Sequence, residues 1–203
     1  MKCTDLGLIT VSESTRLQEE ERKLVLQGES LGRVFFCEHP HTITLGRKLE
    51  KHIDDIKKTL PSYLEVLALS RGGEMTYHGP GQIIIYPVFS LDEKKLGIRE
   101  YVTLLEEKIA TVLNSYGIQT QINCKHRGVW HEDQKLASVG VHISRGVCIH
   151  GVALNVSCDL SFFSYFNPCG LNPNQITSMS VLLNREIPLS EVKNKIITQF
   201  ISF

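Results

Sequence analysis

The sequence lacks both an excess of charge of one sign and any long apolar run. Its 203 residues include 22 basic and 22 acidic side chains, so the formal net charge is zero. This balance gives no reason to expect nucleic acid or a membrane surface as a partner. No apolar run approaches the roughly 20 residues that span a bilayer, and the N-terminal stretch MKCTDLGLITVSEST lacks the apolar core of a signal peptide. We therefore predict a cytoplasmic protein.

Closely paired cysteines and nucleotide-binding loops are also missing. The six cysteines are scattered, with no CxxC pair, which predicts reduced thiols rather than a disulfide framework in a chain without a secretion signal. Two Cys-x-His pairs begin at Cys124 and Cys148, but their spacing matches no common zinc finger. The glycine patterns of dinucleotide-binding and phosphate-binding loops are absent. We expect no metal and no cofactor.

Length and composition point to one domain. A chain of 203 residues that is 42% hydrophobic can build one substantial core. There is no internal repeat and no low-complexity linker. We predict a single catalytic domain over residues 1–203. The part from about residue 160 could pack as a small C-terminal lobe, although no change in composition marks its start.

Helical and strand-like patterns follow one another irregularly. Helices are predicted over residues 14–28, 97–116 and 190–203. Strands are predicted over residues 31–37, 42–45, 128–131, 136–143 and 148–156. In the first helix Leu17, Leu24 and Val25 share a face, and Gly117 stands where the second helix should stop. Strands with only a few interspersed helices favour an α+β sandwich of mixed sheets over a doubly wound sheet.

The stretch RGGEMTYHGPGQ, residues 71–82, places four glycines between two apolar runs. Glycine tolerates positive φ and lets another molecule approach the main chain closely. The Gly-Pro-Gly end alone fits a tight hairpin, but a hairpin requires neither Arg71 nor His78. We interpret the stretch as a rigid, bare ledge within a binding site.

Three further motifs follow in order: KLASVG from Lys135, HGVALN from His150 and NPCGL from Asn167. Together with RGGEMTYHGPGQ they resemble the lipoyl(octanoyl) transferase family. The likeness extends from HPHTITLGR at His39 to ITSMSV at Ile176, which is most of the chain. It implies the fold of the biotin and lipoate protein ligase catalytic domain, a sheet sandwich with a bowl-like pocket.

The resemblance also implies an activity and partners. Members of the family transfer an octanoyl group from acyl carrier protein to a lysine of lipoate-dependent enzymes. The acceptors would be the lipoyl domains of 2-oxoacid dehydrogenases and the H protein of the glycine cleavage system. The enzyme would work without a cofactor, as a cytoplasmic monomer.

Such a transfer benefits from a thiolate nucleophile, because it divides one difficult step into two easier ones. Cys37 and Cys148 lie in apolar, strand-like runs and Cys3 lies at a terminus expected to be loose, whereas Cys124 and Cys158 lie in polar segments without an evident partner. The sixth cysteine stands in a Pro-Cys-Gly context that fits either a structural or a reactive thiol. The resemblance assigns this residue, Cys169, as the cysteine that carries the acyl group.

The resemblance pairs Cys169 with Lys135, although an exposed surface lysine is the usual fate of this residue type. As an ammonium, Lys135 would stabilise the thiolate by charge; as an amine, it would take the thiol proton directly. The second half-reaction also requires a base, because a free lysine has a pKa of about 10.4.

The family pattern also implies an acyl pocket. Its lining would comprise Arg71, Gly72, Gly73, Glu74, Met75, Thr76, Tyr77, His78, Ser138, Val139, Gly140, Gly151, Val152 and Ala153. The small side chains would leave room for methylene groups, and glycine backbone amides could meet the thioester carbonyl. Two histidines stand on this wall, His78 and His150, each either structural or substrate-orienting.

Both protein partners tend to be acidic, so we expect a basic rim around the site. Its candidates cluster beside the motifs: Arg47, Lys48, Lys125, Arg127 and Arg145.

Three other activities stay open at this stage. An ATP-dependent lipoate or biotin protein ligase shares the implied fold, but the GRGRxGR-type loop of biotin ligases is absent. A papain-like hydrolase would use His78 or His150 as the base beside a cysteine, and it would release free acid. A non-catalytic acyl-binding module would bind the carrier protein without becoming acylated.

Overall fold

The computed structural model describes residues 1–123 and 125–201, except for the side chain of Cys169. The strands are β1 (Lys2–Leu8), β2 (Arg33–Glu38), β3 (Thr42–Leu45), β4 (Glu65–Ala68), β5 (Met75–His78), β6 (Gln82–Ser90), β7 (Gln121–Ile122), β8 (Gly128–His131), β9 (Gln134–Ser144) and β10 (Val147–Asn155). They form a large sheet of order β1-β2-β6-β10-β9-β8-β7 and a small sheet of order β4-β3-β5. Each sheet contains one parallel pair among antiparallel neighbours, which confirms the mixed α+β class.

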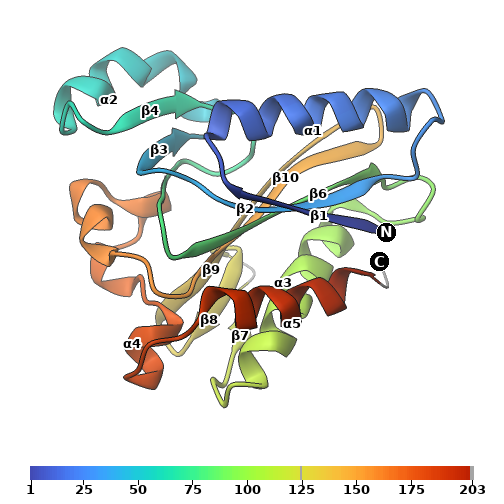
Figure 1. The fold of residues 1–203 in the computed structure, drawn as a ribbon. Helices are drawn as coiled ribbons and strands as arrows, with labels where there is room; N and C mark the ends of the chain where they lie inside the picture. The colour runs from blue at the N-terminus through green and yellow to red at the C-terminus, as the bar shows by residue number, and fades with distance from the viewer. Residues whose placement is uncertain (124, 202–203) are drawn as a thin grey trace.

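Helices cover both faces of the large sheet (Figure 1). The α-helices are α1 (Val11–Leu26), α2 (Ile53–Thr59), α3 (Ile98–Asn114), α4 (Met179–Leu183) and α5 (Leu189–Ile201). Short 3-10 helices are η1 (Arg47–His52), η2 (Leu160–Tyr165), η3 (Pro168–Gly170) and η4 (Pro173–Gln175). Figure 1 shows α1 over one face and α3 with α5 against the other. No helix in the described ranges is both long and apolar enough to cross a membrane.

Strand alternation explains why the large sheet has two cores. In β2, Val34 and Phe36 pack with the side chains of α3 and α5. Their neighbours Phe35 and Cys37 face the other way and pack against α1 with Ile84 of β6. Successive side chains of a strand point to opposite faces, so a sheet covered on both sides needs the near-continuous apolar runs that this sequence contains.

The first helix is confirmed, but its buried face differs from the prediction. It begins at a capping box in which the Thr10 side chain accepts the backbone N–H of Glu13 (3.2 Å). Leu24, predicted on the inner face, is 38% exposed. The inner face instead consists of Val11, Ser14, Gln18, Glu21 and Val25. Its polar members have partners inside the fold, which an apolar pattern does not reveal.

The predicted helix over residues 97–116 is confirmed as α3, and its end is the one expected. Gly117 has φ of +82°, and the backbone N–H of Ile118 reaches back to the carbonyl of Leu113 (3.3 Å). A glycine in the left-handed region ends a helix without steric cost. The predicted strands 42–45 and 128–131 coincide with β3 and β8.

The glycine stretch is not a hairpin, because its two ends belong to different sheets. β5 pairs with β3 in the small sheet, whereas β6 lies between β2 and β10 in the large sheet. Gly81, at the crossing, has φ of +88°, and a Cβ there would lie 2.6 Å from the backbone nitrogen of Cys158. The turn therefore needs glycine both for its conformation and for this close approach.

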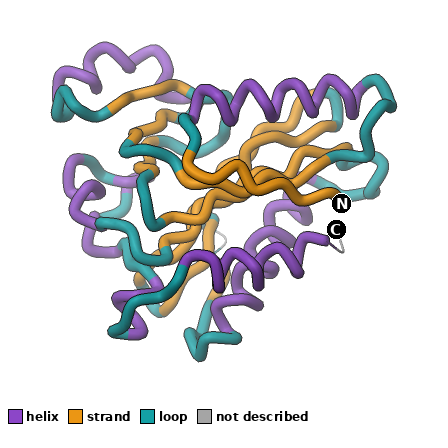
Figure 2. The backbone as a smooth tube through the Cα atoms, in the orientation of Figure 1, coloured by secondary structure: helices purple, strands orange, loops and turns teal. Residues whose placement is uncertain are grey.

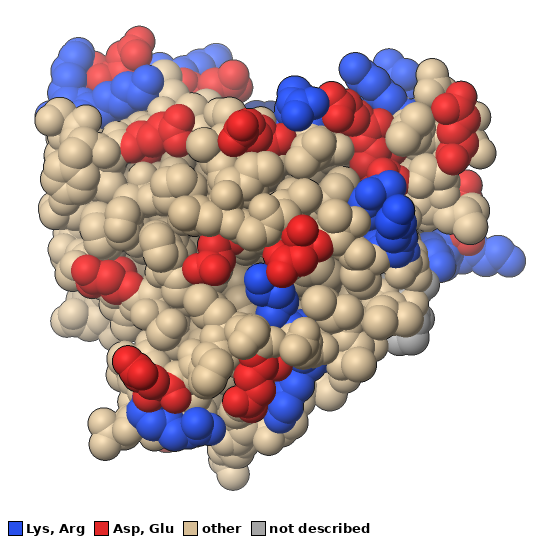
Figure 3. Space-filling view, in the orientation of Figure 1, with Lys and Arg blue, Asp and Glu red and all other residues tan. Residues whose placement is uncertain are grey.

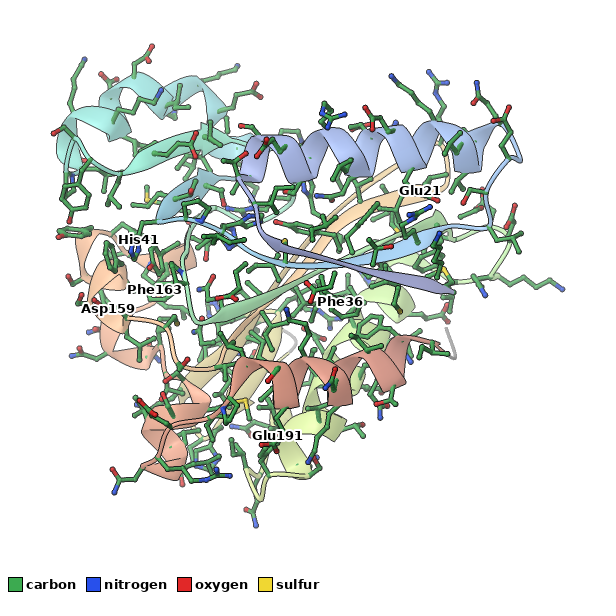
Figure 4. The ribbon with its side chains drawn as sticks, viewed as in Figure 1. Glu21, Phe36, His41, Asp159, Phe163 and Glu191 are labelled. Atoms are coloured by element: carbon green, nitrogen blue, oxygen red, sulfur yellow. The ribbon has the colours of Figure 1, made fainter. Side chains whose placement is uncertain are left out.

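The segment after β10 packs back onto the molecule. Figure 2 shows it as short helical turns joined by loops. Phe163, Leu171 and Ile176 form a cluster with Tyr77 and Trp130, and Figure 4 shows Phe163 beside His41 at this side of the molecule. The later helices supply Met179, Val192, Ile196 and Phe200 to the main core. A separate C-terminal lobe stays a prediction.

Surface charges of both signs are mixed. On the face shown in Figure 3, basic and acidic side chains alternate over α1 and α2, as the balanced composition leads one to expect.

Candidate active site

A cavity of about 380 Å³ is lined by both sheets. The large sheet contributes residues of β6, β9 and β10, and the small sheet contributes β5 with the loop that precedes it. The loop over residues 125–127, Val102 of α3 and Lys48 of η1 complete the lining. The volume falls within the roughly 300–1,000 Å³ typical of small-molecule sites.

The predicted acyl-pocket residues line this cavity, apart from Met75 and Tyr77. Alternation along β5 explains the exception, because Thr76 and His78 face the cavity while their neighbours face away. The Tyr77 hydroxyl lies 2.7 Å from Nδ1 of His41, and its ring stacks on Phe162 with centroids 4.7 Å apart. The role of the lining residues in binding stays a prediction.

Several lining residues were not predicted. The apolar ones are Leu69, Ile84, Tyr86, Val102 and Val141. Ile84 and Tyr86 alternate within the run IIIYPVF, so their common face was readable, but not the cavity that it borders. Two members of the expected basic rim, Arg47 and Arg145, are exposed and do not line the cavity. Lys48, Lys125 and Arg127 do line it.

The floor of the cavity contains two glycines that face each other in the sheet. Gly140 of β9 is paired with Gly151 of β10. A Cβ on Gly151 would lie 2.2 Å from the carbonyl oxygen of Ile85, and one on Gly140 would lie 3.1 Å from Cδ of Arg71. Fewer glycine N–H groups than predicted are available to bind a thioester carbonyl, because the N–H of Gly72 already donates to the carbonyl of Val141 (3.0 Å).

One end of the cavity holds Arg71, His78 and His150, and we call it the histidine end. The Arg71 guanidinium is buried and donates to the carbonyl and hydroxyl oxygens of Thr44, at 2.7 and 2.9 Å. Nε2 of His78 lies 3.2 Å from the same hydroxyl. Burial, with help from His39 and Arg71, lowers the pKa of His78 well below its ordinary value.

His150 has an unusual backbone for its residue type, with φ of +61°. The register of β10 against β6 places it opposite Pro87, which has no N–H to give to the sheet. The backbone N–H of His150 donates to Oε1 of Gln18 (2.8 Å), and its Nε2 lies 3.0 Å from the Ser70 hydroxyl. Burial and Arg71 lower the pKa of His150 to about 3, so the ring is neutral at ordinary pH.

The other end of the cavity holds Lys135, Glu106 and Arg127, and we call it the lysine end. Lys135 is 5% exposed, and its Nζ lies 5.3 Å from the ring centroid of Trp130. Beneath it, the buried carboxylate of Glu106 pairs with Arg127 (3.0 Å) and accepts the backbone N–H of Gly128 (2.6 Å). Along β9 the two ends are separated by six residues, roughly 20 Å.

The NPCGL segment is anchored beside Lys135. Pro168–Gly170 forms the 3-10 turn η3, and Leu171, which follows it, packs with Trp130. Further along, Ile176 forms a bridge with Lys135, whose carbonyl accepts the N–H of Thr177 (3.0 Å). The side chain of Cys169 lies outside the described residues, so its pairing with Lys135 stays a prediction.

The other described thiols are structural in character. Cys37 and Cys148 are fully buried in the cores, as predicted, and burial raises the pKa of both, that of Cys148 to about 11. Cys158 was expected in a polar loop, but it is only 6% exposed and its pKa is raised to about 12. Cys3 was expected at a loose end, but it lies in β1 and pairs with Val34 of β2. Cys124 lies outside the described residues.

Comparison with known proteins assigns the chain to a family. Residues 11–201 match the model of the lipoyl protein ligase A/B catalytic domain. The octanoyltransferase of Bacteroides thetaiotaomicron is 39% identical over 206 residues, covering 95% of this chain and 90% of that protein. The chain belongs to the octanoyltransferase family.

Solved structures agree with this membership at the level of the fold. A lipoate-protein ligase A bound with ATP is 16% identical, with a TM-score of 0.76, and the match covers 98% of this chain and 84% of the other. The biotin protein ligase of Aquifex aeolicus in complex with biotin and ATP is 15% identical, with a TM-score of 0.58, over 99% and 69% of the two chains. The fold predicted for an octanoyltransferase is therefore confirmed.

Proposed function

We propose that this chain transfers an octanoyl group from octanoyl-acyl carrier protein to a lysine of lipoyl domains, through a thioester on Cys169. The acceptors are the lipoyl domains of 2-oxoacid dehydrogenases and the glycine cleavage H protein. One observation carries the proposal: three of the four sequence motifs, RGGEMTYHGPGQ, KLASVG and HGVALN, contribute residues to one cavity, with Lys135 in its wall. Membership of the octanoyltransferase family supports the same chemistry.

In the first half-reaction, the Cys169 thiolate attacks the thioester carbonyl of the donor. A carbon–sulfur bond forms to Cys169, the bond to the carrier's sulfur breaks, and the carrier leaves as a thiol after its thiolate takes the proton of the Lys135 ammonium. The glycine floor and Ile84, Val139 and Val152 offer the eight-carbon chain a wall that is mostly apolar. An acyl chain seated there is oriented for attack, which lowers the entropic part of the barrier.

In the second half-reaction, the acceptor lysine attacks the Cys169 thioester. An amide bond forms, the carbon–sulfur bond breaks, and Cys169 leaves as a thiolate. The attacking amine must lose a proton, and Lys135 is the group proposed to accept it. Because Lys135 is held between Trp130 and Gly128 and is 5% exposed, it is positioned rather than free to sample solvent. The histidine end lies six residues along β9 from Lys135, so His150 is not proposed as the partner of a thiol that pairs with Lys135.

Intact-mass measurement tests the proposal. Mixing the protein with octanoyl-acyl carrier protein, without acceptor, should add one octanoyl group to the wild type and none to Cys169→Ala. The matched control Cys158→Ala should still be acylated. An unmodified wild-type protein, or an acylated Cys169→Ala, would refute the thioester mechanism.

Two further arms separate the rival activities. Modification of a lipoyl domain from free octanoate and Mg-ATP, without the carrier protein, would favour a ligase. Release of free octanoic acid in place of transfer would favour a hydrolase.

Lys135→Ala should keep its fold and slow both half-reactions, because a positioned acid–base group typically contributes about 10²–10⁴-fold. Single-turnover rates of acylation and of transfer measure the two steps separately. Normal rates in Lys135→Ala would remove this residue from the mechanism.

A further inference from the structure

Beneath the reacting end of the cavity lies a carboxylate that the proposed reaction does not use. Glu106 of α3 is fully buried. A buried acid of this kind needs charge or hydrogen-bond partners, since an isolated buried charge is costly. Its partners are the Gly128 N–H at 2.6 Å and the guanidinium of Arg127, which lines the cavity, at 3.0 Å.

Gly128 links this carboxylate to Lys135. Its φ is +141°, and a Cβ there would lie 2.5 Å from Cε of Lys135. The lysine stem therefore passes directly over the residue whose N–H is bonded to Glu106. Burial raises the pKa of the Glu106 carboxyl, and Gly128, Arg127 and Lys135 oppose that rise in this order. The carboxylate and the lysine thus interact through space across one glycine.

We propose that Glu106 is a positioning residue that holds Lys135 as an ammonium ion in the resting enzyme. The inference rests on the proposed function, because it concerns the lysine assigned to that reaction. Its consequence is a choice between two mechanisms. Lys135 stabilises the Cys169 thiolate by charge, gives its proton to the departing thiolate of the carrier, and is then the free amine that accepts a proton in the second half-reaction.

Apart from Glu106, the groups described around Lys135 are cationic, neutral or exposed. Arg127, His126 and Lys125 line the cavity from the loop before β8, and Arg71 lines it from the loop before β5. Cations there disfavour a second cation. Trp130, on β8, contributes a ring face, and the segment at Ile176 and Thr177 contributes neutral backbone. Glu74 also lines the cavity, but it is exposed, whereas Glu106 is buried, where a charge interaction is screened less.

A titration of Lys135 in the free enzyme tests the proposal without any substrate. Lysine labelled with ¹³C at Cε reports the loss of each ammonium proton, and Lys135→Arg identifies the resonance. In the wild type, Lys135 should lose its proton at the pH of the exposed lysines or above it, despite its burial. A titration midpoint of Lys135 well below that of the exposed lysines would overturn the proposal. This measurement needs only the wild-type protein.

Glu106→Gln then removes the charge while keeping the size and an acceptor for the Gly128 N–H. The midpoint of Lys135 should fall by about one to two pH units, as expected for a charge lost at a few ångströms in a partly screened site. The alkaline limb of the single-turnover acylation rate should move to lower pH by a similar amount. The matched control is Glu107→Gln, since Glu107 is the next residue of α3 and is exposed.

Equal midpoints in wild type and Glu106→Gln, or an equal fall in Glu107→Gln, would overturn the assignment. The outcome is separable from that of the proposed function. If the wild type forms no acyl-enzyme, the thioester mechanism fails, while the lysine titration still decides whether Glu106 sets the charge of Lys135.

Discussion

The two ends of the cavity both contain buried ionisable groups, but the neighbours of these groups act differently on their pKa values. At the histidine end, burial and the Arg71 cation lower the pKa values of His78 and His150, so the rings are neutral. At the lysine end, the Glu106 carboxylate lies beneath two cations. Burial is the largest cause at both ends. At the histidine end the Arg71 cation acts in the same direction as burial, whereas at the lysine end Gly128, Arg127 and Lys135 oppose the rise that burial causes in the pKa of Glu106.

This contrast suits an acyl group, whose two ends differ in polarity. The apolar side chains and glycines of the wall favour the apolar tail, and cations near the lysine end would favour the proposed thiolate and the developing charge on the carbonyl oxygen. Substitutions in the glycine floor, at His150 and at the exposed lysines of the lining separate the contributions of packing, of ring neutrality and of surface charge.

The largest effect on stability is expected at the glycine floor next to His150. Gly151→Ala places a methyl group 2.2 Å from the Ile85 carbonyl oxygen and 2.9 Å from Cδ of Pro87. Neither backbone atom nor proline ring can move easily, so the free energy of unfolding should fall by about 3 kcal/mol, the upper range for overpacking. Urea denaturation measures the change.

Gly140→Ala is the matched comparison for Gly151→Ala. Its methyl group would meet the flexible Arg71 side chain at 3.1 Å and the Gly72 oxygen at 3.3 Å, so stability should change by less than about 1 kcal/mol. Because Gly140 lines the cavity, hexanoyl transfer should gain relative to octanoyl transfer. Equal destabilisation by both substitutions would contradict the packing argument.

A smaller effect is expected from the neutrality of the histidine end. The pKa of His150 is about 3 in the folded protein and close to 6.5 in an unfolded chain. The unfolded state therefore binds more protons below pH 6.5, and stability is lost as pH falls from there toward 3. Between pH 8 and pH 5 the loss from one such histidine is at most about 2 kcal/mol.

His150→Asn should reduce this pH dependence, because asparagine does not titrate and tolerates a left-handed backbone. The quantity to compare is the difference in unfolding free energy between pH 8 and pH 5, measured by urea denaturation for wild type and variant. His52→Asn, at an exposed position of η1, should leave the difference unchanged. An undiminished pH dependence in His150→Asn would show that the buried ring already carries a proton.

The contrast between the two ends also shows what could be predicted from sequence. Regular spacing gave α3 and its glycine stop, and the motifs brought together most of the cavity lining. The charge pattern of the site was not predictable, because Glu106 sits within a helical repeat as one of several glutamates, and nothing local distinguishes a buried one. The backbone N–H of His150, which has a left-handed φ, is bonded to Gln18 of α1, 132 residues earlier in the chain. Such pairings over long sequence distances become visible only in the folded chain.

The smallest expected effect concerns partner binding by the exposed lysines of the cavity lining. Lys48 and Lys125 are exposed and line the cavity, whereas Arg145 lies in the β9–β10 turn, roughly 30 Å from Lys135 along β9. If an acidic carrier protein docks here, Lys48→Glu with Lys125→Glu should raise the KM for octanoyl-acyl carrier protein about five- to tenfold at low salt and weaken its salt dependence. Arg145→Glu, the matched reversal, should change neither. Because Lys135 and the apolar lining of the cavity are unchanged, the acylation rate at saturating donor should stay at the wild-type value. An equal effect from Arg145→Glu would mean that overall charge, rather than this rim, attracts the donor.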